Sequence, residues 1–330
     1  MPERSAITQL TNWGVEATAT PGTAVVSGKQ MTALMVEMGP SITFDSFAPA
    51  GYKYDTIVTP GKDMVNARLT GRPTFTESVY PLSGVLGTAV ITTPSGGTAS
   101  RDWTFSPLSN AADVVNTFTV EVGSSVRAQK FSYGLVTGLT FTGDRDTVTL
   151  SGDMIGYAMS DGITITGTAA AVSLIPMLAK QFTIYSNATS GSLGSTALTR
   201  VLSWELAITN RFLPLWTVNQ SQTSFVTHVE VKPTATLRLT VEADAGGMAY
   251  LADARAGTTR FIRVEAIGDI IEAGTIPYKS RFDLAAKVNA ISDFKDDQGV
   301  YAVDFTFDVV HDSGWGKALQ VVLTNTLTAL

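Results

Sequence analysis

Apolar and polar residues alternate strictly in two segments of the chain, 117–122 and 303–309. In the first segment, Phe118, Val120 and Val122 are separated by polar side chains. A period of two places one set of side chains on a buried face and the other toward water or a polar cavity. Both segments are therefore predicted to be half-buried antiparallel strands. Shorter runs of the same kind occur at 237–241 and 262–264.

The predicted elements recur in the same order in the two halves of the chain. Each half reads as a strand, a long loop, a strand, a short helix and three further strands. The first series is predicted at 31–38, 44–61 (the loop), 62–76, 79–86 (the helix), 117–123, 134–142 and 147–157. The second is predicted at 198–208, 210–226 (the loop), 227–242, 248–255 (the helix), 260–267, 282–291 and 300–310. A duplicated β-rich unit whose distinctive segments are long loops is typical of a protein that assembles into a larger structure.

The fold class predicted from these patterns is all-β, because helical periodicity is scarce and no βαβ rhythm occurs. We expect two tandem β-sandwich or partial-barrel units, each with one short flanking α-helix. Residues 1–28 are predicted to form an N-terminal arm, 29–170 the first unit and 171–330 the second. A junction rich in Gly, Ser and Thr is predicted within 161–180. The first unit carries an insertion, 88–111, which is interpreted as a surface loop.

Charge and cysteine content narrow the function classes. The net charge is −6 and charged residues make up only 16% of the chain. Without a Lys/Arg cluster the chain lacks the surface that grips nucleic acid by releasing counterions. The chain has no cysteine, so it holds neither a disulfide nor a thiolate zinc site, and the redox compartment stays open.

Targeting signals are not recognisable in the sequence. Residues 1–28 have no apolar core after a basic start, and no run of about 18 apolar residues occurs anywhere. We therefore expect a soluble protein, made without a cleaved secretion signal and without a membrane partner. Export by a route that leaves no such signal stays open.

Candidate catalytic and metal-binding residues are few. The two histidines are His228 and His311, and neither has a second ligand type at metal-binding spacing. Solvated or capped histidines are the favoured interpretation over a metal site. No G-x-S-x-G motif and no cysteine nucleophile is present, and serines in Gly/Thr-rich loops are good turn formers. We expect no enzyme activity, no metal and no cofactor.

Acidic residues occur in two predicted hairpin turns. Asp144 and Asp146 lie in the turn of the first half, and 295–297 form the matching Lys-Asp-Asp turn of the second. Paired carboxylates of this kind serve acid–base chemistry or calcium binding, but Asp is also an ordinary turn residue and the EF-hand pattern is absent. Turn formation is the favoured interpretation.

The two long predicted loops, 44–61 and 210–226, are rich in aromatic side chains. Aromatic anchors are favoured at protein interfaces, and a loop of this length is more often functional than not. The alternative is that these side chains fold back onto the core of their own unit. The candidate contact residues between subunits or rings are Phe47, Tyr52, Tyr54, Ile57, Phe212, Leu213, Leu215, Trp216 and Phe225.

Four short motifs resemble one known family. Residues 14–18 (GVEAT) and 20–24 (TPGTA) are similar to an opening arm of the form G-x-E-x-T followed by x-P-G-T-A. Residues 203–210 (SWELAITN), with Pro214 just after, look like the strand that leads into a long loop, and 323–326 (LTNT) is similar to the usual ending. The chain thus resembles, over nearly its whole length, the tail tube proteins (major tail proteins) of long-tailed bacteriophages.

The resemblance implies a fold and a function. In that family a β-sandwich with one flanking helix joins its sheets to those of neighbours in a continuous inner β-barrel, and rings stack into a hollow tube that delivers the genome. The long loops, here 44–61 and 210–226, reach the adjacent ring, and the N-terminal arm adds contacts. The duplicated unit favours a ring of three chains over six.

The same resemblance implies partners and a location. The partners are further copies of the chain and the tape-measure, tail-tip and tail-terminator proteins. DNA passes through without tight binding, since a basic lumen would hold its phosphates. The location is the virion, with the host cytoplasm during assembly.

A second function class remains beside this one. A β-sandwich that binds carbohydrate or a host receptor usually gathers aromatic residues on one exposed face. The five tryptophans are instead scattered along the sequence, at Trp13, Trp103, Trp204, Trp216 and Trp315. A β-sandwich hydrolase, the third class, lacks a nucleophile or an acid–base pair in a suitable context.

Overall fold

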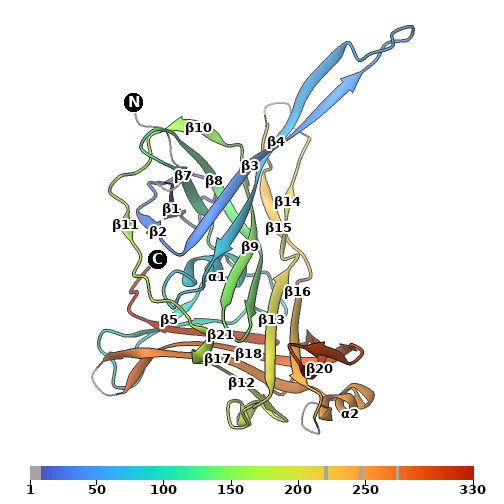
Figure 1. The fold of residues 1–330 in the computed structure, drawn as a ribbon. Helices are drawn as coiled ribbons and strands as arrows, with labels where there is room; N and C mark the ends of the chain where they lie inside the picture. Colours follow the sequence, from blue (N-terminus) through green and yellow to red (C-terminus); the bar gives the residue numbers. More distant parts are fainter. Residues whose placement is uncertain (1–8, 219–221, 245–247, 273–274) are drawn as a thin grey trace.

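Strands make up most of the protein, which confirms the all-β prediction (Figure 1). The computed structural model describes residues 9–218, 222–244, 248–272 and 275–330. Residues 1–8 of the predicted N-terminal arm and 219–221 of the second predicted loop lie outside this part. The two α-helices of the described chain are α1 (Val79–Val85) and α2 (Ala249–Ala256), close to the predicted positions. No helix in the described ranges is long and apolar enough to cross a membrane.

One sheet runs through both halves of the chain. Eight strands of the described chain pair in the order β3–β4–β9–β8–β13–β16–β20–β18. The first four define the first unit: β3 (Leu34–Phe47), β4 (Ile57–Gly71), β9 (Val148–Tyr157) and β8 (Ala128–Gly143). The last four define the second unit: β13 (Val201–Thr209), β16 (Thr234–Glu242), β20 (Val300–Val309) and β18 (Ile276–Ile291). This sheet is not closed into a barrel within one chain.

Each unit adds an outer layer of strands. In the first unit the N-terminal part of β8 also pairs within a layer made of β1 (Leu10–Val15), β2 (Lys29–Met31), β7 (Phe118–Gly123), β10 (Ser160–Ile163) and β11 (Ala170–Ala171). In the second unit β18 continues into a layer made of β12 (Phe182–Asn187), β17 (Arg260–Glu272), β21 (Leu319–Asn325), β6 (Arg101–Phe105) and β5 (Val90–Thr92). One apolar core spans both units, and the rings of Phe141 and Phe282 lie 4.9 Å apart within it.

The two units repeat each other residue by residue in their strand pairing. Arg68 of β4 lies opposite Glu37 of β3, and Arg238 of β16 lies opposite Glu205 of β13. The tripeptide Arg-Leu-Thr that begins at Arg68 recurs at Arg238. We call two residues counterparts when they occupy the same place in the pairing of the two units.

A shared irregularity fixes the counterparts on the remaining strands. The register between β8 and β9 shifts by one residue after Val136, and that between β18 and β20 shifts after Val288. Bulges of this kind are specific features of a sheet and are not accidents of pairing. Beyond the bulge, Leu139 of the first unit is therefore the counterpart of Ile291 of the second.

Both segments predicted as loops contain paired strands instead. Within 44–61, β3 continues to Phe47 and β4 begins at Ile57. Within 210–226, β14 (Phe212–Leu215) forms and pairs with β15 (Thr227–Glu230). The loop prediction was wrong because alternation in these segments is short or missing: it covers only 41–45 in the first, and β14 (Phe-Leu-Pro-Leu) has none.

The insertion at 88–111 is not a surface loop, and that prediction was also wrong. It contains β5 and β6, and β6 pairs with β21 near the end of the chain. Trp103 and Phe105 are buried there. The sequence did not indicate this short strand, because a Gly/Ser-rich turn precedes it and its partner β21 lies more than 200 residues away.

Candidate assembly interface

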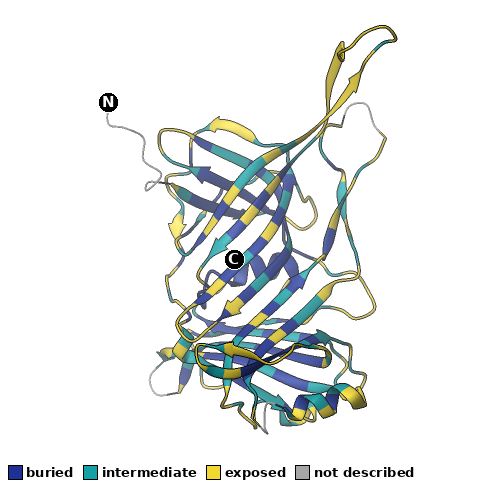
Figure 2. Cartoon of the chain, turned by 45° about the vertical axis from the view of Figure 1, so that its right-hand side comes forward, coloured by how far each residue is buried: buried dark blue, intermediate teal, exposed yellow. Residues whose placement is uncertain are grey.

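A long hairpin, here called the arm (residues 41–63), projects from the body of the molecule (Figure 1). Its far half is exposed on both faces (Figure 2). Monomeric proteins rarely leave contiguous apolar side chains in water, so such a patch marks an interaction surface. The large apolar side chains exposed on the arm are Ile42, Phe44, Phe47, Tyr52, Tyr54, Ile57 and Val58.

The second unit has a counterpart of the arm, here called the docked hairpin (residues 209–233). Its pairs Phe212↔Glu230 and Leu215↔Thr227 are the counterparts of Phe44↔Pro60 and Phe47↔Ile57 in the arm. Both hairpins shift register by one residue between their base and these pairs. They are therefore two copies of one element.

Unlike the arm, the docked hairpin packs against the first unit of its own chain. Phe212 and Phe225 are 2% and 1% exposed. The ring of Phe225 lies 5.0 Å from the rings of both Tyr133 and Tyr157. For Phe212 and Phe225, the alternative that aromatic side chains fold back onto the core of their own unit was therefore wrong, because both pack on the first unit of the same chain.

The other candidate residues of the docked hairpin lie nearer its surface. Leu213 and Leu215 are exposed. Trp216 packs on Phe225 with ring centroids 6.1 Å apart, and the Lys62 Nζ lies 4.9 Å from the Trp216 ring. Lys62 belongs to the base of the arm, so the two hairpins meet there.

Backbone groups hold the tip side of the docked hairpin on the first unit. The Asp63 N–H donates to the Thr223 carbonyl at 2.9 Å. The Ser224 hydroxyl donates to the Asp63 carbonyl at 2.9 Å and accepts from the Ala158 N–H at 3.0 Å. These bonds join the segment before β15 to Asp63 of β4 and to Ala158, which follows β9.

A buried ion cluster holds the base of the docked hairpin. Arg211, only 3% exposed, contacts the carboxylate of Asp113 and lies 3.1 Å from Glu230 Oε1. The Asp113 N–H also donates to Glu230 Oε2 at 2.8 Å. Sequence reasoning missed this cluster, because Asp113 lies 98 residues from Arg211 and no local motif links them.

His228 belongs to this docking surface. Its Nδ1 lies 3.0 Å from the Tyr133 hydroxyl, and its ring packs 5.2 Å from that of Phe212. Burial lowers the pKa of His228, while the nearby Glu230 acts in the opposite direction. His311 lies elsewhere, beside β20. Across the described ranges no three metal-ligating side chains come together.

The junction between the units, here called the seam, is an ordinary antiparallel ladder. Leu139 of β8 faces Ile208 of β13, and Gly143 faces Trp204. A Cβ at residue 143 would lie 2.3 Å from the Trp204 Nε1, so glycine is required for this close approach. The seam joins an edge of the first unit to an edge of the second.

The opposite edges of the two units are open. In the described chain β3 pairs along its length with β4 alone. Ile291 pairs with Phe305 of β20 on one side, and no strand of the described chain covers its other side. Ile291 is the counterpart of Leu139 at the seam. Pro40, which has no N–H, lies in β3, and proline within sheets is confined to such edges.

Polar side chains cover one face of the eight-stranded sheet. Glu37, Arg68 and Asp153 lie side by side across three strands of the first unit and are exposed. Glu205 and Arg238 repeat the first two in the second unit and are exposed as well. Three acids and two bases leave this group slightly acidic.

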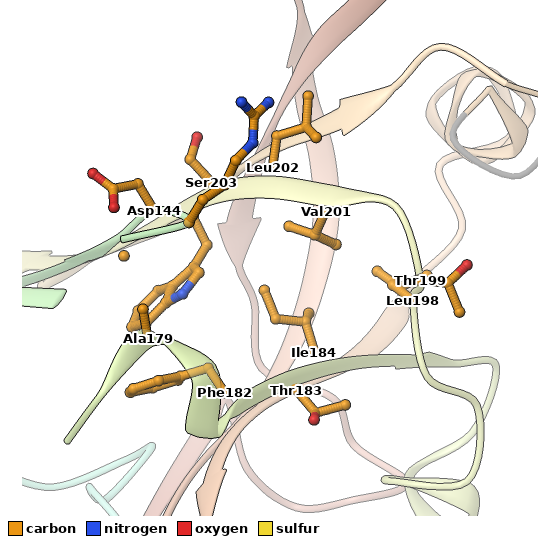
Figure 3. A pocket seen from close by; sticks show the side chains of 13 residues that line it. Asp144, Ala179, Phe182, Thr183, Ile184, Leu198, Thr199, Val201, Leu202 and Ser203 are labelled. Atoms are coloured by element: carbon orange, nitrogen blue, oxygen red, sulfur yellow. The ribbon is translucent and has the colours of Figure 1, made fainter. Parts of the chain in front are cut away.

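A hollow of about 290 Å³ lies between β12 and β13, close to the seam (Figure 3). Asp144 lines it, but this carboxylate belongs to its own turn, where the N–H groups of Thr147 and Asp146 lower its pKa. Arg145 donates to Gln298 Oε1 at 2.5 Å. The turn interpretation of Asp144 is confirmed, whereas the matching turn predicted at 295–297 was wrong: these residues form β19 (Lys295–Asp297), which pairs with β20 across a turn at Gln298 and Gly299.

The N-terminal motif has a structural role. Glu16 is 2% exposed. Its carboxylate accepts hydrogen bonds from the Gly22 N–H at 2.7 Å and the Tyr133 N–H at 2.9 Å. The hydroxyls of Thr117 and Thr119 donate to the same carboxylate at 2.8 and 2.9 Å. Glu16 thereby holds the segment after β1 against β7 and β8.

No family model matches the chain, and no curated protein matches it.

Proposed function

We propose that this protein is a tail tube protein of a long-tailed bacteriophage, which assembles into stacked rings around a channel for DNA. The observation that carries the proposal is the seam. Within one chain it joins one edge of the first unit to one edge of the second, and the two remaining edges are counterparts of those already joined. A second copy can therefore add to the first by repeating the seam, and such head-to-tail contacts generate rings when they close.

The duplication supports a ring of three chains. Each chain already contributes two units joined by the seam, so six units require three copies. The joint between copies would pair β18 of one chain with β3 of the next. Since Leu139↔Ile208 and Thr140↔Ala207 face each other at the seam, their counterparts Ile291↔Pro40 and Ser292↔Gly39 would face each other at the joint.

The polar face of the sheet suits the lining of a channel. Its exposed charges include Glu37, Arg68, Asp153, Glu205 and Arg238, and each of the two arginines lies opposite an acidic residue on a neighbouring strand. A surface of this kind gives phosphates no strong binding site, so DNA can pass along it.

A cysteine pair tests the joint directly, because the chain has no cysteine of its own. Gly39→Cys with Ser292→Cys should form disulfides between copies, since directly opposite residues of a ladder lie within disulfide range. A Cβ at residue 39 meets no other atom within 4 Å. The matched control is Thr140→Cys with Ala207→Cys, which should link within one chain.

The expected product on a non-reducing gel is a series that ends at three times the chain mass of 34.9 kDa. Negative-stain electron microscopy of the same sample should show hollow rings or tubes. Rings of six chains would correct the copy number. A chain that stays monomeric at high concentration, while the control pair oxidises, would contradict the proposal and favour a binding module.

A further inference from the structure

A short segment just before β6, here called the nest (residues 98–100), surrounds a single carboxylate. Its three consecutive N–H groups lie 2.9, 2.8 and 2.6 Å from Oε1 of Glu272, the last residue of β17. The hydroxyls of Thr98 and Ser100 donate to the same carboxylate at 3.2 and 2.7 Å. Successive N–H groups that converge in this way form a concave anion-binding site.

The turn that leads into the nest brings it close to the end of the β17–β18 hairpin. The Gly97 N–H donates to the Pro94 carbonyl at 2.9 Å, and Gly96 within this turn has a φ of +82°, which glycine adopts without strain. A Cβ at residue 97 would lie 3.1 Å from Cδ1 of Ile276, the first residue of β18. Small residues in the turn therefore allow the hairpin end to pack against it.

An arginine behind the nest orients its peptide groups. Arg101 Nη1 donates to the carbonyls of Thr98 and Ser100 at 3.0 and 2.7 Å. The carbonyl of Thr98 and the N–H of Ala99 belong to one peptide unit and point in opposite directions. Because Arg101 holds that carbonyl on one side, the N–H is presented on the other side, to Glu272.

The donors of the nest crowd onto one oxygen of the carboxylate. Glu272 Oε1 alone accepts from the three N–H groups and from the Ser100 hydroxyl, whereas a carboxylate oxygen has two lone pairs. These hydrogen bonds, that of the Ser100 hydroxyl first, lower the pKa of Glu272 to about 2, so the carboxylate is charged at neutral pH. A tetrahedral oxyanion has more acceptor oxygens and would share the same donors with less crowding.

The nest and its carboxylate come from distant parts of the chain. The nest precedes β6, a strand from the first half of the sequence that pairs with β21 in the second unit. Glu272 ends β17, which pairs with β18. A carboxylate in the nest therefore fastens the end of β17 to the segment that carries β5 and β6.

We propose that the nest is a binding site for small oxyanions of the phosphate type, and that the Glu272 carboxylate is its built-in occupant. Docking of the end of β17 and binding of a free oxyanion then exclude each other. The site lies within one chain, so its test does not depend on the ring proposed above.

The experiment measures hydrogen exchange of the full-length chain at 94–105, in inorganic phosphate and in sodium chloride of equal ionic strength. Glu272→Ala empties the nest, so in chloride its N–H groups should exchange at least about tenfold faster than in the wild type. Phosphate at about 10 mM should restore most of the lost protection. The wild type should exchange equally in both salts, because Glu272 fills the nest. Asp269→Ala, which removes an exposed acid from the same strand, is the matched control and should behave as the wild type.

A second substitution ties the response to the nest. Adding Ser100→Ala to Glu272→Ala removes one donor and should weaken phosphate binding by about tenfold. Glu272→Gln keeps the shape of the side chain and replaces the alanine variant if that variant does not fold; phosphate should slow its exchange as well. Unchanged exchange in the Glu272 variant, or faster exchange that phosphate and chloride affect equally, would overturn the proposal. A phosphate response that Ser100→Ala leaves unchanged would indicate an adventitious ion only and would also overturn it.

Discussion

The arm and the docked hairpin are the same element in two environments. Each pairs its strands in the same register and each carries a phenylalanine at the same place, Phe44 in one and Phe212 in the other. One ring is exposed and the other is buried against the first unit. The comparison teaches that the burial of an element is decided by the neighbour it has and not by its own pairing pattern.

The largest expected effect separates these two phenylalanines. Phe212→Ala removes a fully packed ring and should lower the free energy of unfolding by about 3–5 kcal/mol. Phe44→Ala should change that free energy by less than about 0.5 kcal/mol in the free chain, because the side chain lies in water. Urea denaturation of both variants measures the difference. Equal losses of stability would break the comparison.

The buried ion cluster should show the next largest effect. Arg211→Met leaves the carboxylates of Asp113 and Glu230 without their cation and should cost about 3 kcal/mol of unfolding free energy. The counterpart of Arg211 in the arm is Thr43, which is exposed. Thr43→Met should leave the same measurement nearly unchanged. A stable Arg211→Met variant would show that the cluster does not hold the hairpin.

A smaller effect is expected where the two hairpins meet. Lys62→Met removes the cation that lies over the Trp216 ring and should cost about 0.5–1 kcal/mol. Its counterpart Lys232 is exposed, so Lys232→Met should not affect the stability of the free chain. Thermal unfolding of both variants gives the comparison, and matched shifts would contradict it.

The smallest effect concerns pH. Burial lowers the pKa of His228 in the folded protein, so the unfolded chain takes up this proton first as the pH falls. The stabilising contribution of neutral His228 is therefore present above the ordinary pKa of about 6.5 and is lost as the pH falls toward the folded-state value. The counterpart of His228 in the arm is Val58, which does not titrate.

The measurement compares melting temperatures at about pH 7.5 and about pH 5.5 for the wild type and for His228→Gln. The wild type should lose more stability on acidification than the variant. Tyr133 and Glu230 face the imidazole and are present in both proteins, so they cancel in the comparison. An equal loss in both would assign the acid sensitivity to other groups.

The sequence was sufficient to predict strands at 117–122 and 303–309, where apolar and polar side chains alternate. The prediction that 117–122 is half-buried was wrong, because the polar side chains of Thr117, Thr119 and Glu121 are buried as well. The two helices were also predicted, since short apolar runs between strands leave few alternatives. The repeated order of elements followed from the same patterns.

The parts that escaped prediction depend on partners distant in sequence. The far half of β3 has no buried face, and its alternation of polar and apolar side chains is limited to 41–45. The strand of Trp103 needs β21 as its partner, and the burial of Phe212 needs β8 of the other unit. The candidate contact residues could therefore not be divided into exposed and buried ones from the sequence.

Pro40 gives the open edge a property that the seam lacks. Its counterpart at the seam, Ile208, has a backbone N–H and faces Leu139 of β8, whereas Pro40 has no N–H to donate, so each joint of the proposed ring would lack one possible ladder bond. Two copies held together by a single joint would dissociate readily. The last joint of a ring closes within an assembly already held together, at high effective concentration. Closure would then be cooperative, and incomplete arcs would be short-lived beside finished rings.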